Sequence, residues 1–138
     1  MAVKFERTGM LLIISGPSGT GKGTLVKKLM DSDPSFRFSC SVTTRKPRDN
    51  EIEGVHYHFV TEEAFDRLVS ENAFLEHATV HGHRYGTLRA PVERMMAEGY
   101  NVLLDIDPQG AITVMQNAAD YVSVFIPVSY THLTLPTN

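Results

Sequence analysis

The chain has 138 residues, a length typical of one compact domain or of a core that carries a small inserted lobe. Its composition, with 42% hydrophobic residues, 21% charged residues and a formal net charge of -3, is ordinary for a globular protein and favours no nucleic-acid partner. The longest apolar run, residues 10–14, is far shorter than the roughly 20 residues that cross a bilayer, so we expect no membrane association. The only cysteine, Cys40, cannot form an intrachain disulfide and favours a reducing, cytoplasmic location.

The first predicted elements are a buried strand, a glycine-rich turn and a helix. Residues 10–14 form a continuous apolar run, which is typical of a strand covered on both faces in a parallel sheet. A turn at residues 16–19 follows, and apolar residues then recur at helical spacing from residue 25 to residue 30. Asp33 and Pro34 are expected to end this helix, because the residue before a proline disfavours helical backbone.

Residues 36–87 differ from the preceding residues, because they contain short segments in which apolar and polar residues are mixed. Residues 56–60 and 74–80 are predicted to be strands. Between them, Thr61 can cap a helix whose apolar stripe would pack on those strands. We interpret residues 36–87 as a lobe inserted into the chain.

An alternation of helices and strands resumes after residue 88. Pro91 marks a helix start, residues 102–104 form a second buried strand, and Asp107 followed by a proline is typical of another helix start. Residues 121–126 give a third core strand. This pattern predicts an α/β fold with right-handed crossovers. Its parts are a parallel-sheet core (residues 1–35 and 88–127) and a small mixed α/β lobe inserted in it (residues 36–87).

A phosphate-binding loop is predicted between the first strand and the first helix. Residues 16–22 match the start of the pattern G-x-x-x-x-G-K-[ST], in the strand, turn and helix order that the motif requires. The backbone N–H groups of such a loop, the following helix N-terminus and the Lys22 ammonium all attract phosphate oxygens. The predicted ATP-binding residues are Gly16, Pro17, Ser18, Gly19, Thr20, Gly21, Lys22, Gly23 and Thr24.

The loop departs from the general pattern at Gly23, where a Ser or Thr hydroxyl normally contacts Mg²⁺. Thr24 comes one position later, and a shift of one residue turns a helical side chain by about 100°, so Thr24 need not take the place of the missing hydroxyl. Asp105, at the end of a predicted strand, is expected to help hold Mg²⁺ through water. Asp107 can cap a helix, contact a substrate, or do both.

A candidate site for a second substrate begins at residues 41–48. Arg45 and Arg48 are three residues apart, and forked guanidinium groups can clamp a phosphate through paired hydrogen bonds. Spacing alone favours a solvated basic turn instead. The histidines at residues 56, 58, 81 and 83 alternate along predicted strands, but no cysteine or carboxylate cluster completes a metal site, so we expect no histidine-bound metal.

The chain resembles the guanylate kinase family in an ordered series of motifs that spans residues 10 to about 126. The motifs are Gly16-Pro17-Ser18-Gly19, Ser41-Val42-Thr43-Thr44-Arg45 with Pro47-Arg48, Gly54 to Phe59, Phe74-Leu75-Glu76, Tyr85-Gly86-Thr87 and Leu104-Asp105-Ile106-Asp107-Pro108-Gln109-Gly110. An ordered series of this kind is far more specific than the glycine loop alone.

The resemblance implies an enzyme that uses ATP with Mg²⁺ to phosphorylate GMP to GDP in purine nucleotide metabolism. It implies a core like that of P-loop nucleoside monophosphate kinases (residues 1–35 and 88–127) and a GMP-binding lobe (residues 36–87). It implies that the GMP phosphate is held by Arg45, Arg48, Tyr57 and Tyr85. It implies that guanine is read by Ser41, Glu76 and Thr87, with Asp105 and Asp107 as an acidic pair near the base and the metal. Lys22, Arg45 and Arg48 are the expected catalytic residues.

Two alternatives stay open from the sequence. One is a non-catalytic guanylate-kinase-like module that binds protein partners, against which the intact Lys22 loop argues. The other is a kinase for a different nucleoside monophosphate. The sequence predicts no oligomeric state.

Residues 128–138 carry no arginine, no helical stripe and no motif of the family, and we leave them as an unassigned tail. The resemblance implies a lid segment and further core elements beyond this point, so we expect a C-terminally truncated chain. Because transition-state arginines can contribute roughly 10³–10⁵ in rate, we expect such a chain to bind GMP far better than it turns GMP over.

Overall fold

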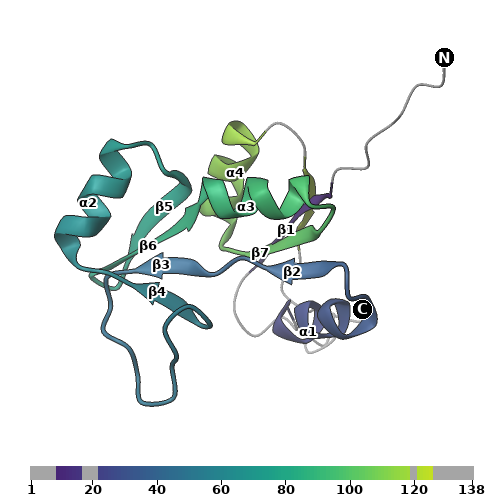
Figure 1. Cartoon of the computed structure of the whole chain (residues 1–138), viewed down its shortest axis with the longest axis horizontal. Helices are drawn as coiled ribbons and strands as arrows, with labels where there is room; N and C mark the ends of the chain where they lie inside the picture. Colours follow the sequence, from purple (N-terminus) through teal and green to yellow (C-terminus); the bar gives the residue numbers. More distant parts are fainter. Residues whose placement is uncertain (1–8, 17–21, 119–120, 126–138) are drawn as a thin grey trace, which may run out of the picture.

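Two four-stranded sheets form the framework of this computed structural model (Figure 1). The structure describes residues 9–16, 22–118 and 121–125. In chain order the elements are β1 (Leu11–Ser15), α1 (Lys22–Ser32), β2 (Phe36–Phe38), β3 (Ser41–Thr43), β4 (Tyr57–Phe59), α2 (Glu62–Ser70), β5 (Phe74–Val80), β6 (His83–Leu88), α3 (Arg89–Ala97), β7 (Asn101–Asp105), α4 (Pro108–Asn117) and β8 (Val122–Phe125). The strand orders are β2-β7-β1-β8 in the first sheet and β4-β3-β6-β5 in the second.

The first sheet is parallel throughout. β1 pairs with both β7 and β8, and β2 pairs with the other edge of β7. Figure 1 shows α3 and α4 on one face of this sheet and α1 on the other. The predicted α/β class with a parallel-sheet core is confirmed. Among the described residues, no helix is long and apolar enough to cross a membrane.

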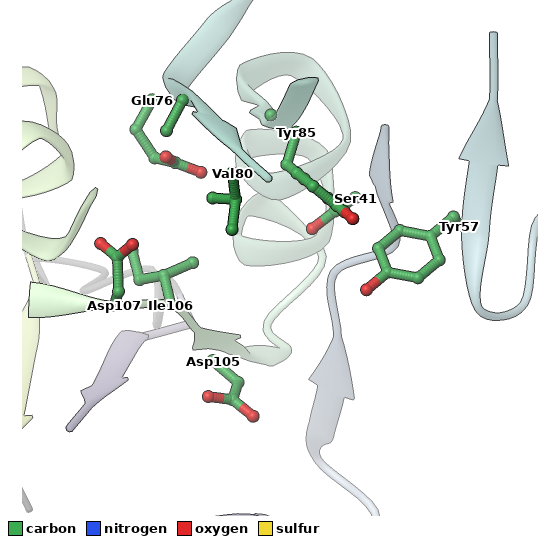
Figure 2. Close-up of a pocket in the computed structure, with 10 residues that line it drawn as sticks. Ser41, Tyr57, Glu76, Val80, Tyr85, Asp105, Ile106 and Asp107 are labelled. Atoms are coloured by element: carbon green, nitrogen blue, oxygen red, sulfur yellow. The ribbon is translucent and has the colours of Figure 1, made fainter. Parts of the chain in front are cut away.

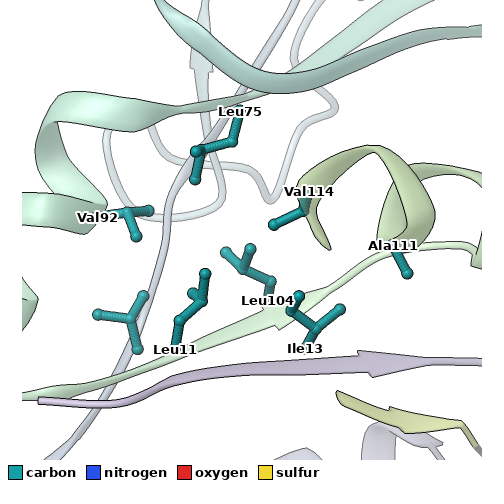
Figure 3. Close-up of a cluster of buried hydrophobic side chains, with 8 residues drawn as sticks. Leu11, Ile13, Leu75, Val92, Leu104, Ala111 and Val114 are labelled. Atoms are coloured by element: carbon teal, nitrogen blue, oxygen red, sulfur yellow. The ribbon is translucent and has the colours of Figure 1, made fainter. Parts of the chain in front are cut away.

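The side chains of β1 pack on both faces of the first sheet. Leu11 and Ile13 pack with Val92 of α3 and Val114 of α4, whereas Ile14 packs with Val26 of α1 (Figure 3 shows the first of these clusters). A strand that is covered on both faces has apolar side chains at successive positions, because neither of its faces contacts water. This explains the continuous apolar run at the start of the chain.

The second sheet is mixed. β6 pairs antiparallel with β3 and with β5, and β4 joins β3 in parallel. Helix α2 covers this sheet through Phe65, which is fully buried with Val42 and Phe74. The predicted cap is confirmed, since Thr61 Oγ1 accepts a hydrogen bond from the Ala64 N–H at 3.1 Å.

The boundary between the two sheets differs from the expected one. The sequence patterns assign residues 36–38 to the lobe, whereas in the structure they form β2, an edge strand of the parallel sheet. Asn101 of β7 anchors this edge: its N–H donates to the Ser35 carbonyl at 2.8 Å and its side-chain amide donates to Ser35 Oγ at 3.0 Å. The chain therefore enters the second sheet only after residue 38. Helix α3 also begins at Arg89, so the Pro91 expected at its start lies within the first turn.

The start of β5 joins the two sheets. Its pairing with β6 shifts register between Phe74 and Glu76, as in a β-bulge, and the three side chains from Phe74 to Glu76 are all buried. Phe74 packs in the cluster under α2, whereas Leu75 packs in the cluster between the first sheet and helices α3 and α4. Asn117 of α4 strengthens the junction, because its side-chain amide donates to the Leu75 carbonyl at 3.0 Å.

Truncation of Phe65 tests the packing of the second sheet. Phe65→Ala should lower the free energy of unfolding by about 3–5 kcal/mol, because it removes a fully buried ring and leaves a cavity. Phe38→Ala is the matched control, since Phe38 is 46% exposed on β2 and should lose clearly less. Urea denaturation followed by circular dichroism measures both values, and equal losses would contradict the packing described for Phe65.

Candidate functional site

A cavity of about 170 Å³ opens between the second sheet and the carboxyl end of β7. The residues that line it are Ser41, Tyr57, Glu76, Ala78, Val80, Tyr85, Gly86, Asp105, Ile106 and Asp107. Figure 2 shows the Glu76 and Asp107 carboxylates on one side of this space and the hydroxyl groups of Ser41, Tyr57 and Tyr85 on the other. Six residues predicted for substrate or metal binding therefore meet in one place, although they come from five separate segments of the chain. These are Ser41, Tyr57, Glu76, Tyr85, Asp105 and Asp107.

The carboxyl ends of β1 and β7 meet beside this cavity. Ile14 of β1 pairs with Asp105 of β7, so the end of β1, which Gly16 follows, lies next to Asp105. Lys22, the first residue of α1, forms an ion pair with Asp105 (Nζ to Oδ1, 2.7 Å) and donates to the Gly16 carbonyl at 3.2 Å. Gly16 has φ of 152°, a backbone conformation that favours glycine. Residues Pro17 to Gly21 of the predicted loop lie outside the described residues.

The oxygen atoms near this edge of the sheet provide only part of the ligand set that a hard cation prefers. Asp105 presents a carboxylate that is 28% exposed, and Mg²⁺ commonly takes one or two carboxylates together with substrate phosphates and water. Thr24 is exposed on α1, and Gly23 offers no side chain. Within residues 9–16, 22–118 and 121–125, no three His, Cys, Asp or Glu side chains gather closely enough to hold a metal by themselves. A cation here would need further ligands beyond the side chains that the described residues supply.

Glu76 is the most buried acid at the site, with 9% of its surface exposed. Its Oε1 accepts a hydrogen bond from the Thr87 hydroxyl at 2.8 Å, because Glu76 and Thr87 are paired positions on β5 and β6. Burial raises the pKa of Glu76 above its usual range, the Thr87 hydrogen bond opposes this rise, and the nearby charge of Asp107 adds to it. The site therefore holds an acceptor whose free oxygen gains strongly from a donor brought by a ligand.

Helix α4 comes close to this carboxylate because residue 110 is a glycine. A Cβ atom at Gly110 would lie 3.0 Å from Glu76 Oε2 and 3.4 Å from Asp107 Oδ1. The Gly110 N–H donates to Asp107 Oδ1 at 2.8 Å, which makes Asp107 the N-cap of α4, as predicted. The substrate contact predicted for Asp107 remains a prediction, compatible with its place in the cavity wall.

Arg45 lies at the other side of the site, next to two aromatic side chains. Its Nε donates to the Tyr85 hydroxyl at 3.3 Å, and its guanidinium carbon is 5.4 Å from the centre of the Tyr57 ring. Glu51 accepts two hydrogen bonds from the same guanidinium, from Nη1 and Nη2, each at 2.9 Å. Glu51 was not among the predicted site residues.

The Arg45 hydrogen bonds, aided by the Arg48 backbone N–H, lower the pKa of Glu51 from its ordinary 4.5 to about 2. This carboxylate therefore stabilises the fold at pH values above 4.5, and its contribution is lost as the pH falls toward 2. The same hydrogen bonds raise the pKa of Arg45, so its positive charge persists at any pH at which the fold exists.

Arg48 is placed differently from Arg45. Its side chain is exposed, and it is the Arg48 backbone N–H that is held, by Glu51 Oε1 at 2.8 Å. Arg45, Arg48 and Thr87 do not line the cavity themselves, although Arg45 and Thr87 contact residues that do. The four histidines considered for a metal site are not clustered: His56 accepts from the Ile52 N–H and His58 contacts Glu53.

Two conservative variants should shift the pKa of Glu76 in opposite directions. Thr87→Val removes the hydrogen bond to Oε1, so it should raise the pKa of Glu76 further. Asp107→Asn removes the nearby negative charge and keeps a side chain that can cap α4, so it should lower that pKa. Carboxyl ¹³C shifts measured by NMR over a pH titration give both values. Shifts of the same sign in both variants would contradict the causes given for the raised pKa.

Comparisons with known proteins agree with this geometry. The family model for guanylate kinase matches residues 8–136, a range that includes most of the segment left unassigned in the sequence analysis. A guanylate kinase of Clostridium perfringens is 50% identical over 121 residues, which are 88% of this chain and 56% of that protein. A guanylate kinase of Sphingopyxis alaskensis is 49% identical over 126 residues, 91% of this chain and 57% of that protein.

A solved structure gives the same result for the fold. The crystal structure of guanylate kinase from Anaplasma phagocytophilum superimposes with a TM-score of 0.72 at 38% sequence identity, over 88% of this chain and 61% of that one. The chain thus spans little more than half the length of the curated relatives that it matches. On the family match, the sequence identities and the shared fold, this chain belongs to the guanylate kinase family.

Proposed function

We propose that this site transfers the terminal phosphoryl group of ATP to GMP, giving ADP and GDP. The observation that carries the proposal is the pairing of a buried carboxylate with a hydroxyl, Glu76 with Thr87, in a cavity that also contains Asp105, the ion-pair partner of Lys22. One end of the cavity thus suits a guanine base, and the other end adjoins the strand edge where a glycine loop begins. Membership of the guanylate kinase family supports the same reaction.

Glu76 would select guanine by its hydrogen-bonding pattern. A carboxylate accepts from both the N1–H and the 2-amino group of guanine, and adenine offers neither at that edge. AMP would leave a buried acceptor without a donor, at a cost of about 1–3 kcal/mol. Ser41, Thr87 and Asp107 would complete the recognition of the base, since Ser41 and Asp107 line the same cavity.

The GMP phosphate would lie beside Arg45. The Tyr85 hydroxyl and the Tyr57 ring are its neighbours there, and Arg48 extends from the same loop. Guanidinium and phenol groups both donate to phosphate oxygens, and a guanidinium can do so through two parallel hydrogen bonds.

ATP would bind at the carboxyl edge of the parallel sheet, as ligands of open α/β sheets generally do. Residues 16–24 supply the loop and the first turn of α1 for this purpose, with Lys22 exchanging Asp105 for the outer phosphates. A Mg²⁺ ion accompanying ATP would neutralise charge on the transferring phosphates, with Asp105 as the protein group nearest to it through water. The rest of the catalysis is positioning: Lys22 and the two arginines hold the two phosphates in line.

The reaction would belong to purine nucleotide metabolism in the cytoplasm, where the single thiol of Cys40 stays reduced. A protein-binding module without catalysis would have little use for the Lys22–Asp105 pair at the end of the sheet, so we favour the enzyme. The carboxylate at Glu76 favours GMP over other nucleoside monophosphates.

Loss of the Glu76 charge should remove the preference for guanine. Glu76→Gln should weaken GMP binding by about 5- to 150-fold, because the amide places a donor where guanine also donates. AMP binding should change little, so the ratio of the two dissociation constants should approach one. Isothermal titration calorimetry with GMP and AMP measures this ratio in the unmodified chain and in the variant. Glu63→Gln, an exposed glutamate of α2, is the matched control.

Product analysis tests the transfer step itself. ³¹P NMR of the chain with Mg²⁺, ATP and GMP over a long incubation should show GDP and ADP forming together, at the low turnover expected for this chain, and AMP in place of GMP should give no such pair. Equal binding of GMP and AMP by the unmodified chain would reject the proposed function.

A further inference from the structure

The proposed function assigns no role to Glu51. Its carboxylate forms the end-on, two-bond pair with Arg45, and both side chains are largely buried, with exposures of 11% for Glu51 and 12% for Arg45. A negative charge next to a phosphate site would repel a phosphate ligand. The hydrogen bonds of the pair indicate a role for Glu51 that can outweigh this repulsion.

Arg45 has almost all of its donors committed. Its Nη1 donates to Glu51 and to the Lys46 carbonyl, its Nη2 donates to Glu51, and its Nε donates to the Tyr85 hydroxyl. These four hydrogen bonds occupy four of the five N–H groups that a guanidinium carries. The remaining N–H is on Nη2, beside the Nε proton, on the edge that faces Tyr85.

The Nε and Nη2 edge of Arg45 is therefore the one nearest to the site. Its Nη2 has one N–H without an acceptor among the described residues, and its Nε N–H, which donates to the Tyr85 hydroxyl, would have to pass to the phosphate. Tyr85 lines the cavity, whereas Glu51 and the Lys46 carbonyl hold the opposite end and the far side of the guanidinium. The Nε and Nη2 edge is one of the two that bind a phosphate through parallel hydrogen bonds. Glu51 thus occupies the edge made by Nη1 and Nη2, and the edge made by Nε and Nη2, which contacts the cavity residue Tyr85, remains for a phosphate.

Glu51 also fixes the loop that carries the second arginine. Its Oε1 accepts from the Arg48 N–H at 2.8 Å, and its own N–H donates to the Arg48 carbonyl at 2.9 Å. The carboxylate is therefore held from two directions and is not a free group that a phosphate would simply displace. One side chain sets the orientation of Arg45 and the course of the backbone at Arg48.

We propose that Glu51 is a positioning residue for phosphate recognition, which holds the Arg45 guanidinium so that its Nε and Nη2 edge, beside the Tyr85 hydroxyl, receives the phosphate of the nucleoside monophosphate. The inference rests on the proposed function for the identity of that ligand. It predicts that removing a negative charge from the neighbourhood of the phosphate weakens binding, the opposite of what simple repulsion would give.

The test compares GMP with guanosine, which has the same base and ribose but no phosphate. In the unmodified chain, calorimetry should show GMP binding more tightly than guanosine. Glu51→Gln keeps the size of the side chain but loses its charge and one acceptor, and it should weaken GMP binding by about tenfold or more. Guanosine binding should stay within about twofold, because the base site at Glu76 is separate from Arg45.

Asp49→Asn is the matched control for charge. Asp49 is exposed in the same loop, two residues before Glu51, and within the described part of the chain it takes part in no ion pair. This variant should leave GMP binding unchanged or slightly tighter. Circular dichroism of each variant should show an unchanged fold.

Three other outcomes would contradict the inference, and each has a different meaning. If Glu51→Gln binds GMP equally well or more tightly, Glu51 competes with the phosphate and does not position Arg45. If GMP and guanosine weaken equally, Glu51 has a structural role only. Should the unmodified chain fail to prefer GMP to guanosine, the proposed function fails, whatever the variant does.

Discussion

The parallel pairing of β1 with β7 is the constraint on which the site depends. It brings the end of β1, which Gly16 follows, beside Asp105 at the end of β7. Because the two strands run in the same direction, both loops leave the sheet at the same edge, which is where α/β proteins bind ligands. The Lys22–Asp105 ion pair exists only because of this alignment. The apolar residues of both strands stabilise it through clusters on both faces of the sheet.

The second sheet contributes the groups that distinguish this site from a general phosphate site. Antiparallel pairing of β5 with β6 sets Glu76 opposite Thr87, and the absence of a side chain at Gly110 lets α4 approach them. The burial of Glu76 is unfavourable for an ionised carboxylate, as its raised pKa indicates. A guanine base that donates two hydrogen bonds to it would remove much of that penalty, so the unfavourable burial is itself a source of selectivity.

Several helices and strands could be predicted from the sequence because their determinants are local. The apolar run of β1, the Thr61 cap of α2 and the Asp107 cap of α4 each depend on neighbours a few residues away. Strands β2, β3 and β6 gave no such pattern, since two of them have three residues and β6 combines polar and glycine positions. The placement of residues 36–38 in the core sheet could not be foreseen, because it depends on pairing with β7, more than 60 residues later in the chain.

The same distinction applies to the site. Glu76 and Thr87 were identified through a family resemblance, since nothing in their local sequence shows that they face each other. Glu51 and Gly110 were missed, because the role of the first depends on a loop that folds back onto Arg45 and that of the second on a neighbour from another sheet. Arg48 carries the right chemistry, but its side chain is exposed and its backbone makes the observed contact.

The bulge at the start of β5 assigns three consecutive residues to three different surroundings. Phe74 belongs to the core under α2, Leu75 to the core of the other sheet, and Glu76 to the wall of the cavity. A rotation of one sheet against the other about this junction would displace the residues next to it least. Glu76 would then move little relative to the parallel sheet, while Tyr57 on β4 and Arg45, just after β3, would move farther. If the site binds GMP as proposed, such an arrangement would separate recognition of the base, near the junction, from delivery of the phosphate, which would move.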